Sequence, residues 1–168
     1  MLDLLNSFIE IIGKQNDLLE QIIKLSEDKR QAIVLGQVQE LDSMVHKEGI
    51  LGQELEKLES ARFVLQMEIA ENLGMPVTEL NAGEIRRVTA EQYPQLATSL
   101  NEHLTTLEKL IGKLRSSIQE NNELLKMSLD YIEEMYYLLS PEDNPGLYSD
   151  KGAADIPGKR LQLIDKKA

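Results

Sequence analysis

The chain has 168 residues and a formal net charge of -11, and it contains no Cys, no Trp and only two Phe. The lack of Cys excludes disulfides, thiolate catalysis and cysteine-ligated metal sites. An acidic chain repels phosphate groups, so nucleic acid and anionic membranes are not expected as partners. Leu, Glu, Lys and Gln are abundant and lose little on entering a helix, which predicts an all-α protein.

The first predicted helix covers residues 4–34, where apolar residues follow three adjacent heptad tracks and give one broad apolar face. Gly36 follows the last periodic residue, at a position where helices commonly end in a left-handed glycine. The tracks consist of Leu4, Ile11, Leu18, Leu25 and Ala32; of Leu5, Ile12, Leu19 and Ile33; and of Phe8 and Ile22.

No targeting or membrane segment is expected from the sequence. The N-terminal region has an acid at Asp3 and no basic segment before an apolar run, unlike a signal peptide. No apolar run approaches the roughly 20 residues that span a bilayer. We therefore expect a cytoplasmic protein.

A second helix is predicted from Val38 to Leu73, again with apolar spacings of three and four. The short link before it favours an antiparallel pair with the first helix. Gly49 and Gly52 lie inside this helix, and each costs roughly 1 kcal/mol relative to Ala. They either permit close helix approach or mark a soft spot, and the sequence favours neither reading.

The connector that follows contains a shorter predicted helix. Gly74 and Pro76 end the second helix. Asn81 followed by Glu84 is typical of a capping box, which predicts a short helix over residues 82–88. Pro94 fits the first turn of the next helix, where its missing N–H costs nothing.

The longest apolar pattern runs over residues 94–139, about 69 Å of helix. Its spacing of three and four is unbroken, which is the seam geometry of coiled coils and bundles. Two members, Asn121 and Ser128, are polar. The seam consists of Ala97, Leu100, Leu104, Leu107, Ile111, Leu114, Ile118, Asn121, Leu125, Ser128, Ile132, Met135 and Leu139.

Three long helices with a short connector predict an antiparallel up-down-up bundle. We assign residues 1–140 to this helical bundle domain and residues 141–168 to a flexible C-terminal tail, because heptad spacing stops and three of the five prolines fall in the last 28 residues. The third long helix is longer than the other two. Part of its seam must therefore pack on the connector or await a partner.

Catalytic and metal-binding residues are not evident. His46 and His103 fall on different predicted helices, outside any Glu-x-x-His pair, and are read as surface residues. No phosphate-binding glycine loop and no nucleophile elbow occurs. We expect neither an enzyme nor a bound cofactor or metal.

The end of the long seam allows two interpretations. Asn121 and Ser128 either face a solvated groove end or fix register as a buried amide does, or else they belong to a groove for a partner helix. The tyrosines Tyr131, Tyr136 and Tyr137 fit a core or an interface, and we favour the interface because Tyr is apolar along its body and polar at its tip.

Several segments resemble the FlgN-type flagellar export chaperone family. Residues 121–132 are similar to an Asn-x-x-Leu-Leu-x-x-Ser-Leu-x-aromatic run in the family's late helix. Residues 29–33, with Gly36 and Leu41, resemble its first helical turn-around. Residues 147–152 resemble its short Tyr-containing tail motif, and residues 73–76 lie where the family breaks between helices.

The resemblance implies a chaperone that holds the hook-associated proteins FlgK and FlgL in the cytoplasm by their C-terminal helices and delivers them to the export gate protein FlhA. It further implies that Tyr148 helps to dock at the gate. A client helix would lie in an apolar groove on the late long helix. The predicted client-binding residues are Asn121, Leu124, Leu125, Ser128, Leu129, Tyr131, Ile132, Met135, Tyr136 and Leu139.

Two other classes remain open. The chain fits a structural coiled-coil or scaffolding bundle that homodimerises through its long helix. A chaperone of another secretion system is less consistent, because those small acidic proteins are usually α/β and this sequence shows no strand pattern.

Overall fold

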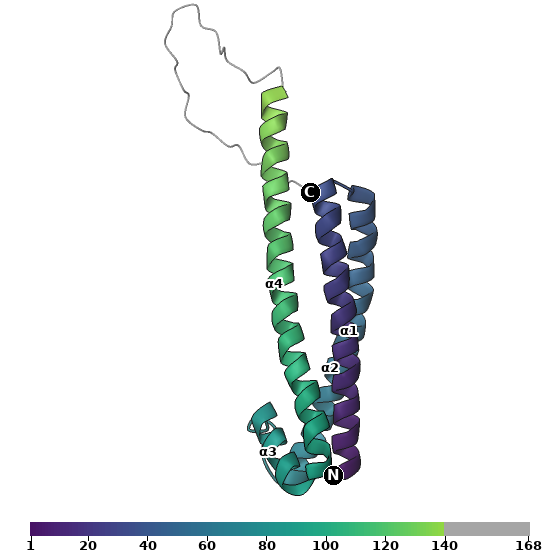
Figure 1. Cartoon of the computed structure of the whole chain (residues 1–168), viewed down its shortest axis with the longest axis vertical. Coiled ribbons are helices and arrows are strands. Elements are labelled where there is room, and N and C mark those ends of the chain that lie inside the picture. The colour runs from purple at the N-terminus through teal and green to yellow at the C-terminus, as the bar shows by residue number, and fades with distance from the viewer. Residues whose placement is uncertain (140–168) are drawn as a thin grey trace, which may run out of the picture. The chain divides into compact units, whose positions relative to one another are not determined.

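The computed structural model describes residues 1–139, which form four helices and no strand (Figure 1). The helices are α1 (Leu2–Leu35), α2 (Val38–Leu73), α3 (Ala82–Gln92) and α4 (Pro94–Leu139). The all-α prediction is confirmed. No helix among the described residues is both long enough and apolar enough to cross a bilayer.

The chain divides into two compact units, Met1–Leu129 and Asp130–Ala168. The first unit contains α1, α2, α3 and most of α4. The described part of the second unit is the end of α4, residues 130–139. The predicted boundary after residue 140 lies at the edge of the described residues and stays a prediction.

Glycines end both α1 and α2, as the sequence predicts. Gly36 has φ 66° and Gly74 has φ 65°, in the left-handed region that Gly adopts without a Cβ clash. After α1 the Gly36 N–H donates to the Ile33 carbonyl at 3.2 Å and the Gln37 N–H donates to the Ala32 carbonyl at 2.9 Å. These bonds satisfy carbonyls at the helix end and let the chain reverse within two residues into α2.

The short helix α3 begins at the predicted cap. The Asn81 side-chain oxygen accepts the backbone N–H of Glu84 at 3.1 Å. The reciprocal half of the capping box is replaced, because the Glu84 carboxylate pairs with Arg87 at 2.8 Å. The helix also runs to Gln92, four residues past the predicted end, and Pro94 then opens α4.

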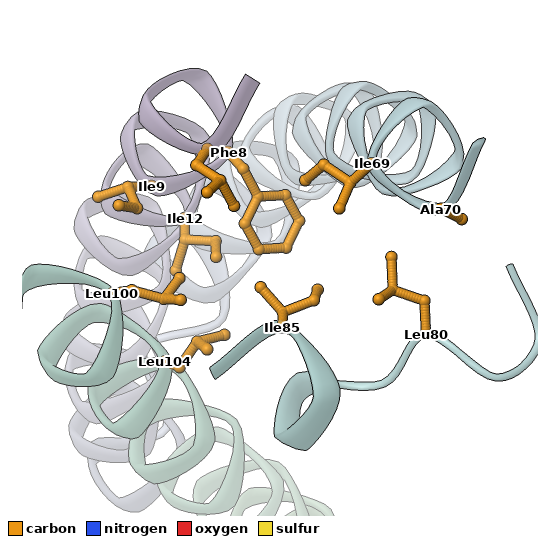
Figure 2. Packing of buried hydrophobic residues seen from close by; sticks show 10 residues of the cluster. Phe8, Ile9, Ile12, Ile69, Ala70, Leu80, Ile85, Leu100 and Leu104 are labelled. Carbon is orange, nitrogen blue, oxygen red and sulfur yellow. The ribbon is translucent and has the colours of Figure 1, made fainter. Parts of the chain in front are cut away.

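The largest core cluster joins all four helices of the first unit. Phe8 of α1 points toward Ile69 of α2, Ile9 and Ile12 of α1 belong to the same cluster, and Leu80 and Ile85 come from the connector and α3 (Figure 2). Leu100 and Leu104 of α4 complete the cluster. Burial of such side chains stabilises a fold by about 1.5–3 kcal/mol each, so this cluster is the main anchor of the unit.

A smaller cluster lies further along α1. Leu19 and Ile23 of α1 are buried with Leu110 of α4, and the partly buried residues packed on them are Leu55, Leu107 and Leu114. Hydrogen bonds pair Asn16 with the carbonyl of His103, and Ser26 with Ser117. Residue numbers rise together along both helices, so α1 and α4 run in the same direction.

The two glycines inside α2 have open surroundings. A Cβ built on Gly49 or Gly52 meets no atom within 4 Å. The glycines therefore mediate no close helix contact among the described residues. They remain as local losses of helix propensity.

Substituting single glycines by Ala distinguishes a glycine that ends a helix, such as Gly36, from a glycine inside a helix, such as Gly52. Gly36→Ala is expected to destabilise the fold by about 1 kcal/mol, because Ala is strained at positive φ. Gly52→Ala is expected to stabilise it by about 0.5–1 kcal/mol, because it adds helix propensity without a clash. Urea unfolding followed by circular dichroism measures both changes. Equal effects of the same sign would contradict the assignment.

Candidate protein-binding surface

A buried polar contact interrupts the apolar packing between α1 and α4. The Asn121 amide nitrogen donates to the Ser26 carbonyl at 2.8 Å and contacts the Ser26 hydroxyl at 2.9 Å. The Ser26 and Ser117 hydroxyls share a hydrogen bond of 2.8 Å. Asn121 is buried, which agrees with the interpretation that a buried amide fixes the register of two helices. Its burial distinguishes it from the exposed residues later in α4.

Ion pairs flank this polar contact. Arg30 of α1 pairs with Glu120 of α4, and Lys113 of α4 pairs with Glu27 of α1 at 3.1 Å. All four side chains are about half exposed, so each pair contributes at most about 1 kcal/mol. Their contribution is to align the two helices rather than to hold them tightly.

Beyond Asn121 the predicted client-binding residues divide by unit. In the first unit, Leu124, Leu125 and Ser128 are half-buried, and the Ser128 hydroxyl donates to the Leu124 carbonyl. Leu129 is exposed.

In the second unit, every described residue is exposed. Ile132 keeps 60% of its surface exposed, and Tyr131, Tyr137 and Leu138 are similarly open. The remaining predicted residues, Met135, Tyr136 and Leu139, are exposed as well. Tyr131, Tyr136 and Tyr137 are therefore not core residues in the described part of the chain.

The two histidines differ from each other. His46 is exposed, as expected. His103 is half-buried and covers Gly13 of α1, where an added Cβ would lie 3.3 Å from its ring. The small residue on α1 makes room for this ring. Within residues 1–139 no group of three or more His, Asp or Glu side chains could hold a metal ion.

A polar contact also joins α1 to α2. The Gln15 amide donates to the Glu59 carboxylate at 2.8 Å, and Arg62 pairs with the same carboxylate at 2.5 Å. The hydrogen bond from Arg62 lowers the pKa of Glu59 below its usual value of 4.5, and partial burial opposes this shift. Glu59 is thus held ionised on the side of α2 that Gln15 faces.

Comparison with known proteins identifies the family of this chain. Residues 1–156 match the FlgN protein family. The chain belongs to the FlgN family. A similar relative is the uncharacterized protein YvyG of Bacillus subtilis (strain 168), 24% identical over 163 residues that cover 96% of this chain and 98% of YvyG. No solved structure matches the chain.

Membership of the FlgN family confirms the resemblance and supports a role as a flagellar export chaperone. Such chaperones bind flagellar proteins and are not enzymes. The exposed apolar residues of α4 are the candidate surface for this binding. Tyr148, the predicted gate-docking residue, lies outside the described residues.

Removing the buried amide tests its structural role. Asn121→Ala should lower the free energy of unfolding by about 1–3 kcal/mol, because it removes the two buried hydrogen bonds that the Asn121 amide makes to Ser26. Ser26→Ala combined with Asn121→Ala should cost less than the sum of the single changes, because the two residues act as a pair. Urea titration of the four proteins measures this coupling. Strict additivity would show that the pair is not coupled.

The pKa of Glu59 gives a pH prediction. A carboxyl with a lowered folded-state pKa stabilises the fold above its unfolded pKa and loses this contribution as pH falls through the folded value. NMR titration should therefore place the Glu59 midpoint below 4.5. Arg62→Gln should raise that midpoint, whereas Arg87→Gln, on α3, should leave it in place. An unchanged midpoint in Arg62→Gln would contradict the stated cause.

Proposed function

We propose that this protein is a cytoplasmic chaperone of flagellar type III export that binds the C-terminal helices of the hook-associated proteins FlgK and FlgL. Binding would prevent their premature assembly, and the complex would deliver them to the export gate protein FlhA. The observation that carries the proposal is the apolar surface left exposed on the last part of α4 in a member of the FlgN family.

The spacing of this surface suits an amphipathic helix. In the sequence, Leu125, Ile132 and Leu139 are seven residues apart and share one track of the heptad pattern. A partner helix with apolar residues at the same spacing would bury them in register. Met135 adds an adaptable side chain, which allows more than one client to fit.

Asn121 and Ser128 are the two polar seam residues among the predicted client-binding residues. Asn121 is engaged with Ser26 and would mark where the intramolecular contact ends. Ser128 satisfies its hydroxyl on its own helix, so a client could cover it without leaving that group unpaired. The tyrosines would lie at the rim, with their rings covered and their hydroxyls in water.

Two further parts of the proposal rest on the family resemblance. Tyr148 would assist docking at FlhA, and residues 141–168 would act as a flexible tail next to a bundle domain of residues 1–140. We further infer an up-down-up arrangement of α1, α2 and α4. The parallel pairing of α1 residues with α4 residues supports this arrangement.

Truncating two exposed residues of α4 tests the client surface. Leu129→Ala with Ile132→Ala should weaken binding of a peptide from the C-terminus of a hook-associated protein at least tenfold, because each buried side chain contributes about 1.5–3 kcal/mol. Calorimetry with the full chain measures the affinity. Both residues are exposed, so the urea midpoint should not change.

Ile50→Ala is the matched control. Ile50 is also an exposed isoleucine, but it lies on α2 and its loss should leave the affinity unchanged. If Leu129→Ala with Ile132→Ala leaves the peptide affinity unchanged, the proposed client-binding surface is wrong. A stable homodimer without peptide binding would favour the scaffold function instead.

A further inference from the structure

The burial of α4 is uneven along its length. Leu100 and Leu104 belong to the largest core cluster, in which ten buried residues from all four helices and the connector pack together (Figure 2). The smaller cluster has three buried residues, of which Leu110 comes from α4. Among the described residues of α4 after Leu104, Leu110 and Asn121 are the only buried ones. The start of α4 is therefore held in the core, whereas the span that follows has few buried side chains.

The part of α1 beneath this span is much better buried than the span itself. Leu19 and Ile23 of α1 are each 3% exposed, and Leu110 of α4 is buried with them. The partly buried residues packed on this cluster are Leu55 of α2 and Leu107 and Leu114 of α4. The span of α4 after Leu104 thus helps to cover an apolar part of α1 while most of its own surface remains in water.

A polar level on α1 separates the two clusters. Gln15 and Asn16 are buried there, between Ile12 of the largest cluster and Leu19 of the smaller one. The Asn16 side chain donates to the His103 carbonyl of α4 at 3.0 Å, and Gln15 donates to a carboxylate of α2. Such a level divides the core, and parts of a core that share few apolar contacts can open separately.

The far end of the span is held by polar contacts that carry a cost. The Asn121 amide nitrogen donates to the Ser26 carbonyl, and the Ser26 and Ser117 hydroxyls share a hydrogen bond. The Asn121 side-chain oxygen is buried as well, but it has no hydrogen-bond partner within residues 1–139. Burial of an unpaired acceptor is unfavourable, and this cost is relieved when the oxygen reaches water.

We propose that residues 108–129 of α4 form a strap that opens from α1 while the largest cluster stays folded. In the closed state the strap covers Leu19 and Ile23, and the contact of Asn121 with Ser26 is its latch. In the open state these side chains reach solvent. Opening adds apolar surface of α1 to that of α4, so a ligand that contacts both helices would favour the open state.

Thiol labelling of the full-length protein tests the strap. The chain has no Cys, so one introduced Cys is the only thiol. Ile23→Cys probes the surface under the strap and Ile12→Cys probes the largest cluster, and both isoleucines are buried on α1. Below the urea midpoint, Ile23→Cys should react faster with a disulfide reagent, and its rate should depend weakly on urea, because a local opening exposes little surface. The Ile12→Cys rate should rise steeply with urea.

The urea dependence decides the outcome. If both rates rise equally steeply, the two thiols are exposed in the same global unfolding and the strap proposal is wrong. Leu19→Cys and Leu100→Cys form a second pair at the same two clusters, so the comparison survives if one of the first variants fails to fold.

A latch variant identifies which helix moves away from α1. Asn121→Ala destabilises the closed state relative to an open strap, so labelling of Ile23→Cys should become about tenfold faster or more, with the same weak urea dependence. If α2 moved away instead, the latch would remain intact in both states and the rate would not change. An unchanged rate would therefore overturn the proposal. Asn122→Ala is the matched control, because Asn122 is the exposed neighbour of Asn121 and its loss should leave the labelling rate unaltered.

Discussion

The buried contact between Ser26 and Asn121 is the point on which the arrangement depends. Up to this point α1 and α4 share apolar residues, including Ile12, Leu19 and Leu100, whose burial favours association without directional demands. At Ser26, as at Asn16, the contact is polar, and the helices are joined there by hydrogen bonds that need defined geometry. The polar contact fixes which residues of α4 face α1.

The apolar seam of α4 does not stop where this contact stops. The helix has 46 residues, compared with 34 in α1 and 36 in α2, and its heptad spacing continues to Leu139. Its exposed residues lie outside the buried core, and we attribute their regular spacing to a partner. A chaperone needs such a surface, one that is accessible when the client is absent and apolar enough to hold it.

Much of the fold could be predicted from the sequence because local signals agree with the tertiary arrangement. Gly36 and Gly74 mark helix ends through the left-handed conformation, and Asn81 marks the start of α3. The extent of α3 was underestimated because its last turn has no apolar periodicity. Its end is set by Pro94, which opens the next helix.

The candidate site was less predictable. Ser26 is the missing member of the track formed by Leu5, Ile12, Leu19 and Ile33, and Asn121 is a polar member of the α4 seam. Because each of these polar residues interrupts an apolar seam, a contact between Ser26 and Asn121 could have been considered from the sequence. Periodicity alone, however, does not determine how one helix is aligned with another. The cover that His103 gives Gly13 was missed for the same reason.

The central claim is that the end of α4 is uncovered in the free chain and becomes covered by a client helix. Hydrogen exchange of the full-length protein, measured by mass spectrometry with and without the C-terminal peptide of a hook-associated protein, tests it most directly. We expect slow exchange around Leu100 and Leu104 in both states, and fast exchange at residues 122–139 that slows when the peptide binds. Exchange at residues 122–139 that is already slow in the free monomer, or that does not change with saturating peptide, would contradict the account.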